Sequence, residues 1–241
     1  MNKYKQVFPN KLTLLAVIHS MADPQHSVRN ALIAFEGGVD GIWLINHGPM
    51  SPETLMKTYQ IVRAEFPNEW IGVNLLGTRL KDILDFVPRS VNGIWTDNAG
   101  VPDERWVGPC EADDFLKNKE HWPGLYFGGT VFKGAANRYD EPADAARRAM
   151  PYMDVVTTSG SQTGSAPMVE KLKTMREAIG DFPLANASGN SIDNVEEFSQ
   201  YTDCLITASS LLTRESQWNG IDELDPDKVS EMVAAVKRIN S

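Results

Sequence analysis

Short apolar runs, rich in Val, Ile and aromatic residues, recur along the whole chain and alternate with amphipathic stretches. Eight of these runs have the length and composition of buried strands: residues 12–18, 41–45, 70–75, 93–96, 124–132, 153–157, 183–186 and 204–207. Helical periodicity is found in residues 24–36, 52–66, 79–87, 143–150, 167–179, 194–200 and 225–239. Several of these helical segments begin with Pro, Asp or Ser, which are favoured at helix N-termini.

Eight strands that alternate with helices over 241 residues have the order and size of a (β/α)8 barrel. We therefore predict an α/β fold in which residues 1–241 form a single TIM-barrel domain. An open doubly wound sheet is the other common arrangement, and it usually carries a glycine-rich fingerprint after its first strand. The first predicted strand ends here in Ile18-His19-Ser20-Met21 without any glycine, which favours the barrel.

A weak internal repeat supports this prediction. An Asp or Asn residue stands just before each even-numbered strand, at Asp40, Asn92, Asp154 and Asp203. The successive spacings are 52, 62 and 49 residues, which is the length of two strand–helix units and fits a barrel of four similar quarters. We expect these four side chains at the N-terminal end of the barrel, where they cap turns rather than take part in chemistry.

Composition and charge exclude several classes of function. Hydrophobic residues make up 42% of the chain and charged residues only 23%, which excludes intrinsic disorder. The net charge of −9 argues against nucleic acid and anionic lipid as partners. No apolar run is long enough to insert into a membrane, and no signal peptide is recognisable at the start. Two cysteines are too few for a disulfide framework, so we expect a cytoplasmic protein.

Polar residues at the predicted C-terminal ends of the strands are the candidates for catalysis, because TIM-barrel active sites lie there. These candidates are His19, Asn74, Asp97 and Lys133. Lys133 can neutralise a phosphate or carboxylate or form a Schiff base, or it can extend to solvent at the rim. Asp97 can act as a general base or metal ligand, or cap its loop. Asn74 can orient a ligand hydroxyl or close a turn.

The last three loops of the predicted catalytic face combine glycine with hydroxyl residues. Glycine lets backbone N–H groups approach an anion closely, and helix N-termini present unpaired donors. Phosphate sites in this fold commonly form between loops seven and eight, although plain turn chemistry produces similar sequences. The predicted phosphate-binding residues are Ser159, Gly160, Ser161 and Gly164 in loop six, Ser188 and Gly189 in loop seven, and Ser209 and Ser210 in loop eight.

Metal binding has weaker support in the sequence. His19 and His47 share the predicted catalytic face with Asp97, and two His with one carboxylate form a known metal-binding set. The three residues form no compact motif, so no metal site is predicted. Mg²⁺ is kept as a candidate cofactor that would accompany a phosphorylated ligand.

Several segments together resemble the BtpA/SgcQ family of barrel proteins. The main one is Thr-Thr-Ser-Gly-Ser-Gln-Thr-Gly at residues 157–164, which is similar to that family's Thr-Gly-Ser-Gly-Thr-Gly loop. Ser159 and Gln162 stand in this run where glycine is usual. Further similarity lies at residues 16–19, 72–76, 208–211 and 218–222, so the resemblance extends over nearly the whole chain.

The resemblance implies a (β/α)8 fold related to phosphate-binding barrels, in a family linked to photosystem I assembly and to sugar uptake and metabolism. Together with the loops, it leads to the hypothesis of an enzyme that acts on a small phosphorylated metabolite, either a sugar phosphate or a phosphoribosyl compound. Isomerisation, aldol-type cleavage and phosphoribosyl transfer all remain open. The alternatives are a non-catalytic assembly or stability factor, which could dock through the Trp-containing stretches Trp95–Trp106 and around Trp218, and a sugar-phosphate sensor. Residues 99–108 and 213–224 are candidate lids, and barrels of this size often form homo-oligomers.

Overall fold

The computed structural model describes residues 2–46, 48–102, 108, 110–133, 135, 137–162, 164–213 and 223–241. Its centre is a closed barrel of parallel strands in chain order, and β8 pairs with β1 to complete the ring. The strands are β1 (Thr13–Ser20), β2 (Gly41–Asn46), β3 (Ile71–Asn74), β4 (Gly93–Thr96), β5 (Leu125–Gly129), β6 (Val155–Thr158), β7 (Leu184–Asn186) and β8 (Cys204–Thr207). The predicted TIM barrel is therefore confirmed.

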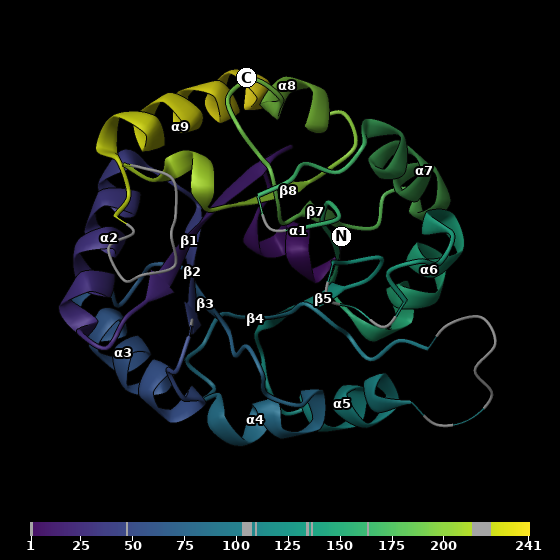
Figure 1. The fold of residues 1–241 in the computed structure, drawn as a ribbon, viewed down its shortest axis with the longest axis horizontal. Coiled ribbons are helices and arrows are strands. Elements are labelled where there is room, and N and C mark those ends of the chain that lie inside the picture. Colours follow the sequence, from purple (N-terminus) through teal and green to yellow (C-terminus); the bar gives the residue numbers. More distant parts are fainter. Residues whose placement is uncertain are drawn as a thin grey trace.

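Helices surround the barrel as an outer ring, and α9 lies beside α2, so the last helix closes the ring (Figure 1). The helices are α1 (Lys3–Val7), α2 (Pro24–Gly37), α3 (Pro52–Glu65), α4 (Ile83–Phe86), α5 (Glu111–Lys119), α6 (Pro142–Ala149), α7 (Val169–Ile179), α8 (Val195–Phe198) and α9 (Pro226–Asn240), with short 3-10 turns η1 (Leu80–Asp82), η2 (Met150–Tyr152) and η3 (Ser209–Leu211). The sequence analysis did not identify α1 or α5. In the described part of the chain, no helix combines the length and apolar character needed to cross a bilayer.

The fifth strand is shorter than the sequence predicts. Residues 124–132 form one apolar run, but β5 ends at Gly129 because the backbone turns sharply after it. Val131 has a φ of +44°, a left-handed conformation that is strained for a β-branched residue. The absence of a side chain on Gly129 lets loop four pack directly onto the strand, since a Cβ there would lie 2.1 Å from the carbonyl oxygen of Asp97. Lys133 therefore lies in loop five, beyond the strand.

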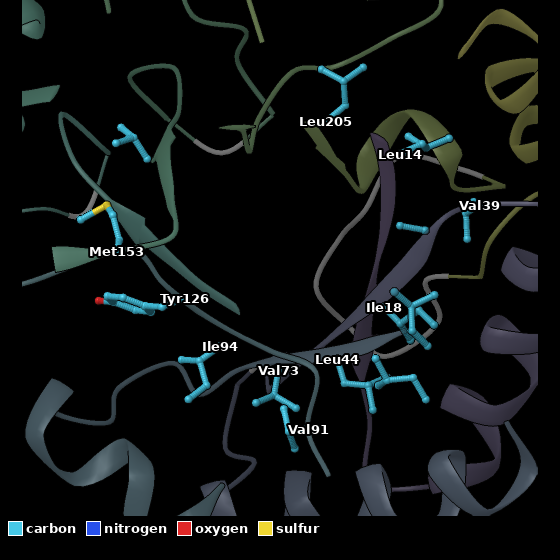
Figure 2. Packing of buried hydrophobic residues seen from close by; sticks show 14 of the residues in the cluster. Leu14, Ile18, Val39, Leu44, Val73, Val91, Ile94, Tyr126, Met153 and Leu205 are labelled. Atoms are coloured by element: carbon cyan, nitrogen blue, oxygen red, sulfur yellow. The ribbon is translucent and has the colours of Figure 1, made fainter. Parts of the chain in front are cut away.

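Side-chain alternation along the strands divides the apolar residues into two cores. On β1, Leu14 and Ile18 belong to the outer core, whereas Leu15 and Val17 belong to the core inside the barrel. Figure 2 shows residues of the outer core, among them Leu14, Ile18 and Leu205, which fill the space between strands and helices. The inner core contains three of the six tryptophans, Trp43, Trp70 and Trp95.

Helix α1 closes the N-terminal end of the barrel, and Figure 1 shows it on the barrel axis. Tyr4 is fully buried, packs edge-to-face on Phe127, and donates a hydrogen bond to the main-chain carbonyl of Asp203. Phe8 packs against Trp70 with ring centroids 5.3 Å apart. The start of the chain is therefore a structural plug.

The four repeated Asp and Asn residues make the same contact in each quarter of the barrel. Each side-chain oxygen accepts a hydrogen bond from the main-chain N–H of a residue at the start of the preceding strand, at 2.7–2.9 Å. Each main-chain N–H donates in return to the carbonyl of that same residue. The pairs are Asp40 with Leu14, Asn92 with Ile71, Asp154 with Tyr126, and Asp203 with Leu184. The predicted structural role at the N-terminal end is confirmed.

A basic side chain from the helix before the odd-numbered strand reinforces three of these contacts. Arg63 of α3 donates to Asn92, and Lys119 of α5 lies 2.6 Å from Asp154. Arg176 of α7 pairs with Asp203. At Asp40, burial raises the pKa of the carboxyl, and the positive charge of Lys237 on α9 partly offsets this effect. The repeat therefore extends from the strands to the helices outside them.

Candidate functional site

A cavity of about 460 Å³ opens at the C-terminal ends of the strands, and we call it the central cavity. This volume is in the range of sites that enclose a small ligand. Its floor is formed by side chains that point inward from the strands, including Val17, Ile45 and Ile206. Its walls come from loops three to eight. The location agrees with the general position of active sites in this fold.

Lys133 and Asp97 form one wall of the central cavity. Burial lowers the pKa of Lys133, while the negative charge of Asp97 raises it. The Lys133 ammonium lies 5.2 Å from the ring centroid of Phe132, and its main-chain N–H donates to Ser159 Oγ at 3.0 Å. Lys133 is thus a half-buried cation that faces the cavity beside a carboxylate, so the two can exchange or share a proton with a bound molecule.

Asn74 and His19 contribute in different ways. Asn74 is buried at the end of β3 and donates from Nδ2 to Asp97 Oδ1 at 3.1 Å. It lies behind Asp97 and lines a separate cavity of about 150 Å³ rather than the central one. His19 is buried at the end of β1 and lines the central cavity directly. The structure therefore brings three of the four catalytic candidates to one cavity and places Asn74 as a support for Asp97.

Loop seven is fastened to loop six. Ser188 Oγ donates to the carbonyl of Ser165 at 2.7 Å and accepts from the N–H of Gly160 at 2.7 Å. Gly189 has a φ of +63°, and a Cβ there would lie 2.1 Å from the main-chain nitrogen of Ala166. These contacts use the hydroxyl of Ser188 and require glycine at position 189. Both residues line the central cavity. Because the Ser188 hydroxyl is already hydrogen-bonded and Gly189 has no side chain, it is mainly their main chain that is available to a ligand.

Loop eight brings hydroxyl side chains to the cavity. It continues from β8 into the short turn η3, and Ser209 and Ser210 of this turn line the central cavity. Within the described ranges, three buried groups that line the cavity have no hydrogen-bond partner: Ser210 Oγ, Thr207 Oγ1 and Trp95 Nε1. Buried polar groups are normally satisfied, so these three groups are candidates for hydrogen bonds to a polar ligand.

The residues predicted in loop six divide between two places. Gly164 lines the central cavity and has a φ of +78°. Ser159, Gly160 and Ser161 line a second cavity of about 590 Å³ between loops five and six, which we call the side cavity. Ser159 is fully buried, and its Oγ accepts from Lys133 and donates to the carbonyl of Gly160. Helix α7 begins only at Val169, so its N-terminus does not reach the central cavity through this loop.

The hypothesis of a metal site set by His19, His47 and Asp97 falls partly outside the described residues, because His47 is not among them. Among the residues that are described, no group of three or more His, Cys, Asp and Glu side chains could hold a metal ion. Trp106, Trp218 and parts of the two candidate lids, 99–108 and 213–224, also lie outside the described ranges.

Sequence reasoning missed several residues of the site. Trp95 and Thr207 stand near the ends of β4 and β8, so strand alternation could have identified them as inward-facing. Asn190 lines the central cavity and donates to the carbonyl of Ile206, which joins loop seven to β8. Lys171 lies on α7, and it lines the side cavity. No sequence pattern identifies it as a site residue.

Comparison with known proteins agrees with the architecture. The model of the BtpA family matches residues 139–238, which confirms the resemblance over loops six to eight. No curated protein sequence matches this chain at a significant level.

Solved structures similar in fold include tryptophan synthase from Mycobacterium tuberculosis, at 16% identity and a TM-score of 0.66 over 98% of each chain. Another is (S)-3-O-geranylgeranylglyceryl phosphate synthase from Thermoplasma acidophilum in complex with its substrate sn-glycerol-1-phosphate, at 12% identity and a TM-score of 0.66 over 99% of each chain. At these identities the similarity shows the fold alone.

Proposed function

We propose that this BtpA-like barrel binds a small phosphorylated metabolite in the central cavity, with the phosphate on loops seven and eight. The observation that carries the proposal is that the half-buried Lys133 lines one cavity together with the glycine and hydroxyl residues of loops seven and eight. Ser209 and Ser210 of η3 line the same cavity as Lys133. Dipolar donors and one cation around an enclosed volume suit a phosphate better than a neutral ligand.

The position of these donors supports the same proposal. Phosphate sites in TIM barrels commonly form after strands seven and eight, near the N-terminus of a short extra helix. Here η3 is such a turn, and it follows β8 directly. Gly189 lets the main chain of loop seven approach the cavity without a side chain in between. A barrel similar in fold has sn-glycerol-1-phosphate as its substrate, which is a ligand of the proposed class.

Asp97 and Lys133 are placed to act on the other end of the ligand. The amide of Asn74 donates to Asp97 Oδ1 and so restricts the orientation of the carboxylate. A carboxylate beside an ammonium can remove a proton from one ligand atom while the ammonium stabilises the negative charge that develops. His19 at the end of β1 lines the same cavity and is a further proton donor or acceptor. Isomerisation, aldol-type cleavage and phosphoribosyl transfer are the reaction classes in keeping with this arrangement.

The experiment is a calorimetric titration of the full chain with inorganic phosphate, sn-glycerol 1-phosphate, ribose 5-phosphate and fructose 6-phosphate, each with and without Mg²⁺. Glycerol, ribose and fructose serve as the unphosphorylated counterparts. We expect binding by at least one phosphorylated compound and none by its counterpart. At one hundred times the dissociation constant, such a ligand stabilises the fold by about 2.7 kcal/mol, or roughly 5–10 °C in melting temperature. Binding of the unphosphorylated sugars with equal affinity would contradict the proposal.

Two variants test the assignment of residues. Ser210→Ala and Lys133→Met each remove one charge-assisted contact, so each should weaken binding of the phosphorylated ligand about tenfold. Lys173→Met is the matched control, because Lys173 is an exposed lysine on α7 outside both cavities. Unchanged affinity in both site variants would place the phosphate elsewhere. A ligand that binds and is recovered unchanged would identify a sensor rather than an enzyme.

A further inference from the structure

The side cavity has a composition that the proposed phosphate site does not explain. It lies between loops five and six, near the first turns of α6 and α7, and has a volume of about 590 Å³. It shares Lys133 and Ala166 with the central cavity, so the two cavities adjoin at these residues. A ligand that occupies both cavities would cross this boundary at Lys133.

Positive charge is concentrated around this cavity. Lys133, Arg138 and Lys171 line it, and Asp140 is the one acidic residue among its described lining residues. Asp140 already forms an ion pair with Arg148 on α6. In a chain with a net charge of −9, three basic residues against one paired carboxylate make an uncommon local excess.

Lys171 is the most unusual of these basic residues. Its Nζ donates to the carbonyl oxygens of Val131 at 2.5 Å and Ser159 at 2.7 Å, and no carboxylate of the described residues forms an ion pair with it. An ammonium group has three N–H donors, so one is left for a further acceptor. Burial without an opposite charge lowers the pKa of Lys171 to about 8. An anion beside it would supply the missing counter-charge.

The cavity is also open to a ligand from outside. Arg138 is exposed, and its guanidinium lies 4.5 Å from the ring centroid of Tyr139. Tyr139 and Met168 form the rim and are 86% and 78% exposed. These large apolar side chains can cover the carbon chain of a ligand, while Arg138 and Lys171 bind its charge.

We propose that the ligand of this barrel carries a second anionic group, phosphate or carboxylate, and that the side cavity binds this group through Arg138 and Lys171. The proposal rests on the proposed function, because the first phosphate occupies the central cavity. Lys133 lies between the two groups and contacts both cavities. The substrate class is thereby narrowed from any phosphorylated metabolite to bisphosphates and phosphorylated carboxylic acids.

The test compares pairs of ligands that differ in one anionic group. Fructose 6-phosphate is compared with fructose 1,6-bisphosphate, and ribulose 5-phosphate with ribulose 1,5-bisphosphate. Glycerol 3-phosphate is compared with 3-phosphoglycerate to test a carboxylate. Each pair is titrated calorimetrically into the full chain at one ionic strength. We expect at least one doubly anionic member to bind at least about tenfold more tightly than its partner, as one added charge-assisted contact predicts.

Arg138→Met assigns the effect to the side cavity. Arg138 has no ion pair with a described residue and is exposed, so its replacement should not disturb folding. The variant should lose most of the tenfold affinity advantage of the doubly anionic ligand. Its affinity for the pair member with one anionic group should stay unchanged. Arg238→Met, an exposed arginine on α9, is the control and should keep the advantage.

The outcomes separate this inference from the proposed function. Equal affinities within every pair, or an advantage that survives Arg138→Met, would overturn the side-cavity site while binding of the monophosphates still supports the central one. If no member of any pair binds, both proposals fail.

Discussion

The two ends of this barrel differ in whether certain polar groups have hydrogen-bond partners. At the N-terminal end, Asp40, Asn92, Asp154 and Asp203 each accept a main-chain N–H at short distance, and three of them also meet a basic side chain. At the C-terminal end, three buried donors around one cavity have no partner within the described residues. Satisfied polar groups stabilise the fold, whereas unsatisfied ones reduce stability and are retained where a ligand supplies the missing contact.

The apolar residues differ between the two ends in the same way. Helix α1 fills the N-terminal end with Tyr4 and Phe8, so the barrel interior is closed there. At the other end the inner core stops at Trp95 and Ile206, above which the cavity begins. The comparison predicts that substitutions at the N-terminal end change stability and leave ligand affinity intact, and that substitutions at the C-terminal end do the reverse.

The largest expected effect is at the plug. Tyr4→Ala removes a fully buried aromatic ring and its hydrogen bonds to Thr13 and Asp203. The free energy of unfolding should fall by about 4 kcal/mol, and the melting temperature by roughly 8–16 °C. Tyr139→Ala is the matched control, since that ring is largely exposed. Urea and thermal unfolding measure both variants, and a similar small loss in each would show that α1 does not close the barrel.

The second effect concerns the hydrogen bond between a repeated Asp or Asn side chain and the main chain of the preceding strand. Asp154→Ala leaves the N–H of Tyr126 and the ammonium of Lys119 without their acceptor, and both groups are largely buried. Loss of one partner of such a pair should cost about 3 kcal/mol. Asp144→Ala breaks an exposed ion pair with Arg147 and should cost less than about 0.5 kcal/mol. Equal costs in urea unfolding would mean that Asp154 is no more than a surface charge.

The third prediction crosses from stability to binding. Ser210→Ala removes a buried hydroxyl that has no partner in the described chain, so stability should stay the same or increase by up to about 1 kcal/mol. The same variant should bind the phosphorylated ligand about tenfold more weakly. Thermal unfolding in the absence and presence of ligand measures both quantities. A clear loss of stability without ligand would show that the hydroxyl is part of the fold rather than of the site.

The fold could be predicted from the sequence because its signals are local and repeated. Strand alternation, helix starts and the spacing of Asp40, Asn92, Asp154 and Asp203 all depend on neighbours in the chain. The turn at Val131 could not be predicted, because contacts from Thr158 and Lys171 hold its carbonyl oxygen in place. The predicted strand therefore extended through this turn to residue 132, whereas β5 ends at Gly129.

The candidate site could be predicted only in outline. The position of Lys133 and of loops seven and eight follows from the general rule for barrel strands, and the structure places them around one cavity. The sequence did not show that the residues of loop six are divided between two cavities. Ser159 and Gly160 are held in place by hydrogen bonds to Lys133 and Ser188, which are distant in sequence. Lys171 lines the side cavity only because α7 packs beside it. The way in which a helix packs on the barrel cannot be read from a local sequence pattern.

The smallest expected effect is a pH dependence of the second anionic contact. Burial lowers the pKa of Lys171 to about 8, so its positive charge is lost as the pH rises from 7.5 to 9.5. Phosphate monoesters are already dianionic in this window, since their second pKa is about 6. The affinity advantage of a bisphosphate over its monophosphate should therefore fall about threefold across it.

The groups that face Lys171 in the side cavity decide how this measurement is controlled. Arg138 keeps its charge throughout, and Asp140 is paired with Arg148. Burial also lowers the pKa of Lys133, but Lys133 lines both cavities, so the ratio of the two affinities largely cancels its contribution. Lys171→Arg should keep the advantage at pH 9.5, because a guanidinium remains charged there. A constant ratio in the unmodified chain from pH 7.5 to 9.5 would remove Lys171 from the anion site and leave Arg138 as the residue that binds it.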